Sequence, residues 1–376
     1  MSDVDSASRN IGRPSEARGT VVACQANFYR VQVPLAAGQT SVYFLCTRRA
    51  LLKKMGQQIV VGDQVQLEEL DWQSQRGAIA ACYPRRNLLD RPPISNVDQI
   101  LLVFALAEPA LDPMQLSRFL VKAESTGIPV SLCLNKRDLL SDQQIADWKT
   151  RLNGWGYSPV VLSIQQDRQL PAALLEQLQG RISVVAGPSG VGKSSLLNRL
   201  VPHVEARTNQ VSGKLGRGRH TTRHVELFEL PGGGLLADTP GFNQPDVTCS
   251  VEALKDCFPE IRQGHSRCQF KDCSHRGEPG CAVGTHWERY DHYCLFLEDV
   301  LRHQETISQR PDADAAAKIK IGSDGQVQHE PKLEAKKYRR VSRRQRHQDL
   351  QDMCADLTAI DSIDDLDDAA LEEYGF

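Results

Sequence analysis

One eight-residue segment constrains the fold of this 376-residue chain more than any other. Residues 187–194 read Gly-Pro-Ser-Gly-Val-Gly-Lys-Ser and fit the phosphate-loop pattern G-x-x-x-x-G-K-[ST]. An apolar segment at 181–186 precedes it and a helical pattern at 195–200 follows it, which is the context that this pattern requires. The sequence therefore predicts an α/β domain that binds the phosphates of a nucleotide.

The residue types in this loop suit contact with phosphate oxygens. Glycines let backbone N–H groups turn inward, and the N-terminus of the following helix adds favourable dipole charge. We expect Lys193 to reach the β- and γ-phosphates and the Ser194 hydroxyl to ligate Mg²⁺. The predicted nucleotide contacts of the loop are Gly187, Pro188, Ser189, Gly190, Val191, Gly192, Lys193, Ser194 and Ser195.

Apolar runs and helical patterns alternate through residues 97–245, which we assign to the nucleotide domain. The apolar runs are 100–107, 129–134, 160–164 and 182–186. This alternation predicts a mostly parallel sheet with helices on both faces.

Residues 19–84 have a different pattern, with short strand-like segments separated by glycine and polar breaks. The segments 19–24, 27–33, 41–46 and 63–70 predict a small closed barrel such as an OB-fold, which we expect to bind RNA. A barrel with only a structural role is the alternative. Residues 1–18 are polar and are expected to be disordered.

A base-reading motif follows the apolar run at 129–134. Asn135, Lys136 and Asp138 form the pattern N-K-x-D, and the Asp138 carboxylate can accept from both the ring N1–H and the exocyclic amine of guanine. Adenine lacks both donors, so binding it would leave a buried carboxylate unpaired, and GTP is favoured over ATP. Ser163 lies in a segment that loosely matches a second guanine-contacting motif, although a plain sheet strand explains it nearly as well.

Two further segments match the switches of nucleotide hydrolases. Asp238-Thr-Pro-Gly241 fits D-x-x-G, where Asp238 would hold Mg²⁺ through water and the Gly241 N–H would sense the γ-phosphate. Residues 207–224 are basic and glycine-rich, and either Thr221 or Thr222 should ligate Mg²⁺. The N-K-x-D motif precedes the phosphate loop here, so the order is a circular permutation, which keeps every strand neighbour.

Residues 246–305 contain a candidate metal site followed by a helical pattern at 287–304. Three thiolates and one imidazole in a tight spacing suit tetrahedral Zn²⁺ in a closed, structural site. Because this region can bury little apolar surface, metal binding should supply much of its folding energy. The predicted ligands are Cys268, Cys273, His275 and Cys281.

Together these motifs resemble one family, the circularly permuted GTPases that depend on the small ribosomal subunit (the RsgA, or YjeQ, family). The resemblance covers about residues 19–300 and rests on N-K-R-D, G-P-S-G-V-G-K-S, G-R-H-T-T, D-T-P-G-F and C-x4-C-x-H-x5-C in that order. It implies an N-terminal OB-fold, a central permuted GTPase and a C-terminal zinc domain.

The family resemblance also implies a role for His220. The family lacks the usual glutamine after D-x-x-G, where this chain has Phe242, and is thought to position the attacking water with the histidine that matches His220. His220, Lys193 and Thr222 are thus the expected catalytic residues. The alternative is that His220 only binds RNA or packs against other residues of the protein. The implied partners are GTP, GDP and the small subunit with its rRNA, late in subunit assembly.

The charge pattern sets the remaining expectations. The formal net charge of −2 hides a tail at 306–376 whose basic block at 332–347 precedes an acidic block at 348–376. The basic block could bind rRNA phosphates and the acidic block could mask it, whereas a disordered solvated tail is the alternative. With no secretory signal and no apolar run long enough for a bilayer, we expect a cytoplasmic monomer.

Two other functions remain to be separated from GTP hydrolysis. One is an RNA-binding scaffold with a vestigial nucleotide site, against which the intact Lys193, Ser194, Asp238 and Asp138 argue. The other is an ATPase, which Asp138 opposes.

Overall fold

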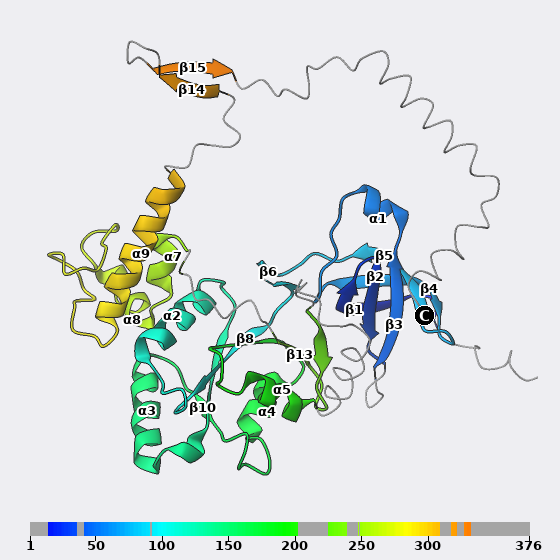
Figure 1. Ribbon diagram of the computed structural model, residues 1–376, viewed down its shortest axis with the longest axis horizontal. Coiled ribbons are helices and arrows are strands. Elements are labelled where there is room, and N and C mark those ends of the chain that lie inside the picture. The colour runs from blue at the N-terminus through cyan, green and yellow to red at the C-terminus, as the bar shows by residue number, and fades with distance from the viewer. Residues whose placement is uncertain are drawn as a thin grey trace, which may run out of the picture. The chain divides into compact units, whose positions relative to one another are not determined.

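The computed structural model describes residues 14–35, 41–90, 92–201, 225–238, 247, 249–308, 317–321 and 327–331 (Figure 1). The chain divides into two compact units, residues 1–306 and residues 307–376. The second unit contains an antiparallel hairpin of β14 (Ala317–Ile321) and β15 (Val327–Pro331). The basic and acidic blocks of the tail lie outside the described residues.

The first unit begins with a closed five-stranded barrel, as the sequence predicts. Its strands have the order β1-β2-β3-β5-β4 around the barrel, and β4 closes onto β1. A short helix, α1 (Ala50–Lys54), follows β3. The strands are β1 (Ala17–Gln25), β2 (Phe28–Val33), β3 (Val42–Arg48), β4 (Gln64–Asp71) and β5 (Arg76–Cys82).

Strand β5 has no counterpart among the predicted strands of the barrel. Its sequence is rich in alanine, and only Ile79 is fully buried in the barrel core. Small side chains give a weak alternation signal, so the pairing of β5 with β4 and β3 decides its conformation.

A six-stranded sheet forms the centre of the unit, in the order β10-β9-β8-β11-β13-β12. The first five strands are mutually parallel, which confirms the predicted α/β domain, and the edge strand β12 runs antiparallel to β13. The strands are β8 (Gln99–Ala105), β9 (Val130–Asn135), β10 (Val160–Val161), β11 (Ile182–Ala186), β12 (Leu227–Glu229) and β13 (Leu235–Asp238).

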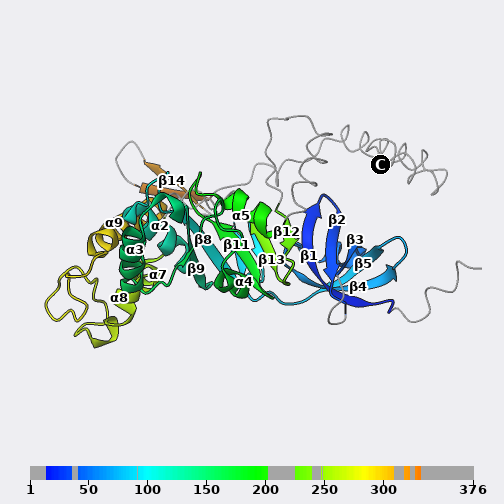
Figure 2. The ribbon, with the colours of Figure 1, turned by 90° about the horizontal axis from the view of Figure 1, so that it is seen from below.

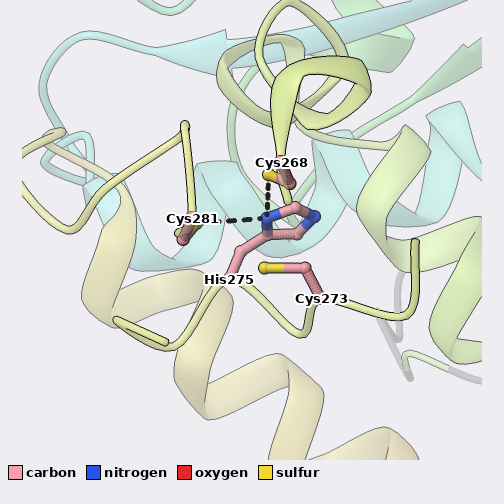
Figure 3. Close-up of side chains that lie close together, drawn as sticks. All are labelled: Cys268, Cys273, His275 and Cys281. Carbon is pink, nitrogen blue, oxygen red and sulfur yellow. Dashed lines mark hydrogen bonds between the residues drawn. The ribbon is translucent and has the colours of Figure 1, made fainter. Parts of the chain in front are cut away.

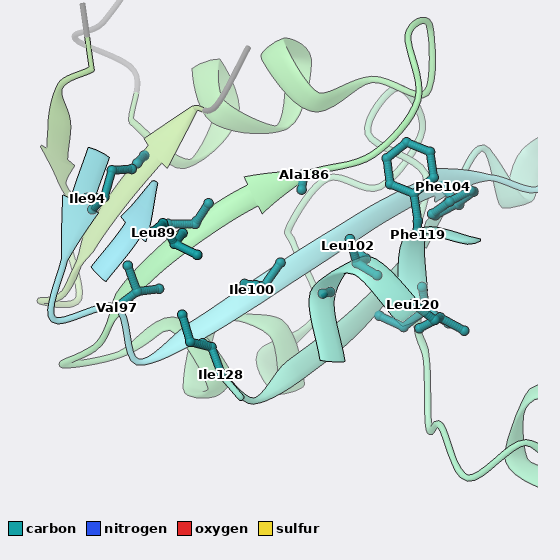
Figure 4. Packing of buried hydrophobic residues seen from close by; sticks show 14 of the residues in the cluster. Leu89, Ile94, Val97, Ile100, Leu102, Phe104, Phe119, Leu120, Ile128 and Ala186 are labelled. Carbon is teal, nitrogen blue, oxygen red and sulfur yellow. The ribbon is translucent and has the colours of Figure 1, made fainter. Parts of the chain in front are cut away.

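Helices cover both faces of this sheet because the side chains of β8 alternate between two apolar cores. Ile100, Leu102 and Phe104 pack with α2 (Pro113–Glu124) on one face, the face shown in Figure 4. Leu101, Val103 and Ala105 share the other core with side chains of two further helices, α4 (Ala172–Leu178) and α5 (Lys193–Leu200). Figure 2 shows the neighbouring strands β9, β8, β11 and β13 of this sheet.

Local capping fixes where the helices on the first face begin. The Asp112 side chain accepts from the backbone N–H groups of Met114 and Gln115 at the start of α2. Ser141 and Gln144 form a capping box at the start of α3 (Asp142–Gly154). These caps satisfy N–H groups that have no partner within the helix.

Residues 247–308 form a small, mostly helical region after the sheet, as expected. Its helices α7 (Val251–Asp256), α8 (Pro259–Arg262) and α9 (Tyr290–Ser308) share one core around Phe258, Tyr293 and Phe296. Val121 of α2 belongs to the same core. None of the helices in the described ranges is both long enough and apolar enough to cross a membrane.

A small hairpin, β6 (Leu88–Asp90) and β7 (Pro93–Ser95), joins the barrel to the sheet. Leu89 and Ile94 of this hairpin are buried in the same core as Val22 and Val61 of the barrel and Ile100 of the sheet. Apolar packing is therefore continuous from the barrel to one face of the central sheet.

Candidate functional site

The predicted nucleotide motifs converge at one edge of the central sheet. Asn135 is the last residue of β9, Gly187 follows β11, and Asp238 ends β13. Ser163 lies two residues after β10. Since these four strands are parallel, their carboxyl ends lie at the same edge, where ligands bind in open α/β sheets.

The conformation of the phosphate loop requires glycine at two positions. Gly187 has a φ of +142°, and a Cβ there would lie 2.1 Å from the Val103 carbonyl oxygen. Gly192 has a φ of +103°, and a Cβ there would lie 2.4 Å from the Asn135 Nδ2. The backbone of the loop can approach both neighbours only without side chains at these positions.

Helix α5 starts at Lys193, directly after the loop, and the lysine side chain folds back over it. The Lys193 ammonium donates to the carbonyl oxygens of Gly187 at 2.9 Å and Pro188 at 2.6 Å. The side chain therefore lies along the loop, where a phosphate-binding lysine is needed. Ser194 and Ser195 occupy the first turn of the same helix.

Asn135 connects the base-reading motif to the phosphate loop. Its Nδ2 donates to the Val191 carbonyl oxygen at 2.8 Å, and its Oδ1 accepts from the Ile164 N–H at 3.1 Å. The side chain is buried, with 3% of the residue exposed. The side-chain amide of Asn135 therefore links three loops at this edge of the sheet, namely its own loop, the phosphate loop and the loop after β10.

The chain turns sharply after Asn135. Lys136 adopts a left-handed conformation with a φ of 63°, and its ammonium donates to the Glu108 carbonyl oxygen. The short helix η2 (Arg137–Leu139) then places Asp138 on the next turn, half buried. The motif is therefore held from the loop after β8 as well as from the phosphate loop.

Asp167 is part of this site although the sequence motifs do not include it. Its carboxylate accepts from Arg137 at 2.6 Å and from the Ser163 N–H at 2.8 Å. The hydrogen bond from Arg137 lowers the pKa of the Asp167 carboxyl below its usual value. The signal in the sequence is a serine followed four residues later by an aspartate after a buried strand, and it is too weak to select alone.

The switch segments are described only at their borders. The backbone of Asp238 pairs with Val185 of β11, immediately before the phosphate loop. His220, Thr221, Thr222, Gly241 and Phe242 lie outside the described residues, and the same holds for the side chain of Asp238.

A second candidate site brings together three thiols and one imidazole. One ligand atom from each of Cys268, Cys273, His275 and Cys281 lies within 4.8 Å of all the others. The His275 Nδ1 is 3.5 Å from the Cys281 sulfur and 3.8 Å from the Cys268 sulfur (Figure 3). This donor set, half buried or buried, can hold a metal ion.

Neighbouring groups fix the loop that carries these ligands. The Glu278 carboxylate accepts from the backbone N–H groups of Ser274 and Arg276, each at 2.8 Å. Tyr293 of α9 donates to the Ser274 carbonyl oxygen at 2.7 Å. Cys257 is buried in the apolar core and lies outside the ligand set.

Known proteins with similar sequences and structures agree with this architecture. A family model described as RsgA GTPase matches residues 82–248. A relative from Nostoc sp., "Small ribosomal subunit biogenesis GTPase RsgA 1", is 55% identical over 89% of this chain and 96% of its own length.

Two solved structures share the fold over most of the chain. One is YloQ, a circularly permuted GTPase, with 32% identity and a TM-score of 0.65 over 81% of this chain and 99% of that one. The other is YjeQ from Thermotoga maritima, with 30% identity and a TM-score of 0.62 over 76% of this chain and 99% of that one. The sequence, the permuted nucleotide domain and the cluster of three cysteines and one histidine show that this chain belongs to the RsgA family of GTPases.

Proposed function

We propose that this chain hydrolyses GTP to GDP and phosphate while bound to the small ribosomal subunit, late in the maturation of that subunit. The convergence of four motif-bearing loops at one sheet edge supports the nucleotide site. The Nostoc relative, "Small ribosomal subunit biogenesis GTPase RsgA 1", supports the ribosomal role. The barrel would contribute to rRNA binding, which the family resemblance implies.

Each motif residue has a proposed role at this edge. Lys193 would contact the β- and γ-phosphates, and Asp138 would accept from guanine while Asn135 holds its loop. Backbone N–H groups of the phosphate loop would donate to phosphate oxygens. The remaining nucleotide contacts are those expected from the sequence, namely Lys136, Ser163, Pro188, Ser189, Gly190, Val191, Gly192, Ser194, Ser195 and Gly241.

Two metal ions would serve different purposes. Mg²⁺ would neutralise charge on the phosphates, held by Ser194, by Thr221 or Thr222, and through water by Asp238. Zn²⁺ would fill the closed site of three thiols and one imidazole and stabilise the fold without taking part in hydrolysis.

Hydrolysis itself would depend on positioning more than on covalent chemistry. His220 would orient the attacking water, and loss of the γ-phosphate would release Gly241 and move the metal-binding region relative to the barrel. Binding of rRNA would order residues 207–224 and so accelerate a slow intrinsic reaction. We expect this to occur in the cytoplasm and with a monomeric protein.

The test is phosphate release from GTP, and separately from ATP, with and without purified small ribosomal subunits. We expect slow hydrolysis of GTP alone, with a rate that rises at least about tenfold when small subunits are added. Hydrolysis of GTP without stimulation would remove the ribosome as activator. Absence of hydrolysis under every condition would instead favour a scaffold that only binds RNA.

Base specificity can be tested separately from the rate. Asp138→Asn should shift binding from guanine toward xanthine nucleotides, because the amide can donate where the carboxylate accepts. Asp142→Asn, at the exposed start of α3, is the matched control with the same change of charge and should keep the preference for GTP.

A further inference from the structure

Strand β12 has an unusual position between the two predicted switches and the barrel. It starts three residues after residue 224, where the basic segment with the first switch ends, and it pairs antiparallel with β13, which ends at Asp238 of the second. Leu227 pairs with Ala237, so the start of β12 lies next to the end of β13. This three-residue strand therefore lies directly between the described borders of the two predicted switches.

Glu229, the last residue of β12, is bound by two hydroxyl groups of the barrel. Tyr43 of β3 donates to Oε2 at 2.6 Å, and Ser41 donates to Oε1 at 2.7 Å. Gln32 of β2 donates in turn to the Ser41 hydroxyl at 3.1 Å. Both carboxylate oxygens of Glu229 therefore have barrel partners, separated from it by almost 190 residues of sequence.

Glu226, just before β12, provides a second connection at the opposite end of the strand. Its Oε1 lies 3.3 Å from Arg30 of β2, and its backbone bridges to Ala23 of β1. The Arg30 guanidinium also stacks 4.4 Å from the centre of the Tyr43 ring, which joins the two connections. Strands β1, β2 and β3 of the barrel thus all contact the segment 226–229.

We propose that Glu226 and Glu229 are positioning residues that couple the nucleotide state of the predicted switches to the barrel. The inference rests on the proposed GTP hydrolysis but assigns a route that neither the motifs nor the relatives specify. The carboxylates connect β12 to β2 and β3 through side-chain contacts. A displacement of β12 when the γ-phosphate leaves would pull on barrel strands directly.

Coupling of this kind is reciprocal. If the GTP and GDP states place β12 differently, the barrel must differ between them, and a ligand of the barrel must favour one nucleotide by the same factor. Leu227 of β12 and Val22 of β1 share one buried apolar core, which keeps the two elements in contact, while the partly exposed polar contacts beside it can rearrange at little cost.

Amide hydrogen exchange with GDP and with a non-hydrolysable GTP analogue tests the coupling in the full chain without ribosomes. We expect exchange in β2 and β3 to differ between the two nucleotides in the wild-type protein. Tyr43→Phe, which removes one donor to Glu229, and Glu229→Gln should each abolish that difference. Glu68→Gln is the control, because its ion pair with Arg49 joins two residues of the barrel and matches Glu226 in exposure.

Small-subunit-stimulated GTP hydrolysis gives the second readout. Tyr43→Phe and Glu229→Gln should each lose about fivefold or more of the stimulation while unstimulated hydrolysis stays within twofold of wild type. Exchange in β2 and β3 that is the same with both nucleotides in wild type, or a difference that survives in both variants, would overturn the proposal. A nucleotide-dependent difference without any ribosomal stimulation would support the coupling and count against the ribosomal function alone.

Discussion

The two regions that flank the nucleotide domain attach to it by different kinds of contact. Beside the apolar core that Val22 of the barrel shares with Leu227, the barrel meets β12 through half-exposed hydroxyl and carboxylate groups. The metal-binding region meets α3 and the chain after it through Arg289, which is fully buried. Its guanidinium lies 5.0 Å from the Trp155 ring centre across the junction, and it is held within the metal-binding region by an ion pair with Glu260 at 2.6 and 2.9 Å.

This difference indicates that one junction is rigid and the other can change its contacts. Because the contact between Arg289 and Trp155 is buried, the second junction should keep α3 and the metal-binding region together as one body. Contacts that are polar and partly exposed contribute little stability, so the β12 junction can change with nucleotide. The rigid junction lies on elements that follow the guanine motif, and the adaptable one lies on the strand between the predicted switches.

The largest effect should come from the metal centre. Removing the ion with a strong chelator should unfold residues 247–308, because metal binding supplies on the order of 10 kcal/mol in small structural sites. Tryptophan fluorescence should report the change, since Trp287 packs against Phe258 of this core. Thermal unfolding that chelation leaves unchanged would show that the four ligands do not hold the fold.

Loss of Arg289 should give the next largest effect. Arg289→Ala should lower the free energy of unfolding by about 3–5 kcal/mol, because Glu260, whose side chain is only 16% exposed, would lose its partner and the buried guanidinium would leave a cavity. Denaturant unfolding measures the change. The double variant Arg289→Met with Glu260→Leu should recover most of the loss, and failure to recover would mean that the aromatic contacts of the guanidinium dominate.

In the barrel, loss of the Asp63 carboxylate should lower the free energy of unfolding more than loss of a β12 contact. Its carboxylate is 1% exposed and accepts from Arg85 at 2.7 and 2.8 Å and from Ser95 at 2.7 Å. Asp63→Ala should cost about 1–3 kcal/mol, since these donors would lose a buried partner. The measurement is denaturant unfolding beside Glu68→Gln, which should stay within about 0.5 kcal/mol of wild type.

The smallest effect on stability is expected at β12 itself. Glu226→Gln removes one ion pair whose side chains are 28% and 34% exposed, and should cost less than about 1 kcal/mol. Chemical unfolding of this variant tests the comparison directly. A cost as large as that of Arg289→Ala would mean that the two junctions do not differ in kind.

Most of the candidate site could be read from the sequence because its residues sit in short motifs. The phosphate loop and the four metal ligands each occupy fewer than fifteen consecutive residues, so their geometry is largely local. The parallel strands before the phosphate loop and the guanine motif carry continuous apolar runs, so these strands could also be predicted. Strands β5 and β12 could not be predicted in this way. β5 is rich in alanine, and β12 has only three residues, whose pairing is set by their neighbours.

The chemical groups of this protein can be recognised in its sequence because they lie in short motifs, namely a phosphate loop, a guanine motif and a set of three thiols with one imidazole. Only the tertiary structure showed that Asp167 joins two nucleotide loops, that Arg289 is buried between aromatic rings, and that Glu229 binds the barrel. The physical reason is distance along the chain. Arg30 and Glu226 are 196 residues apart, and such a contact depends on how whole strands pack, which no local pattern encodes.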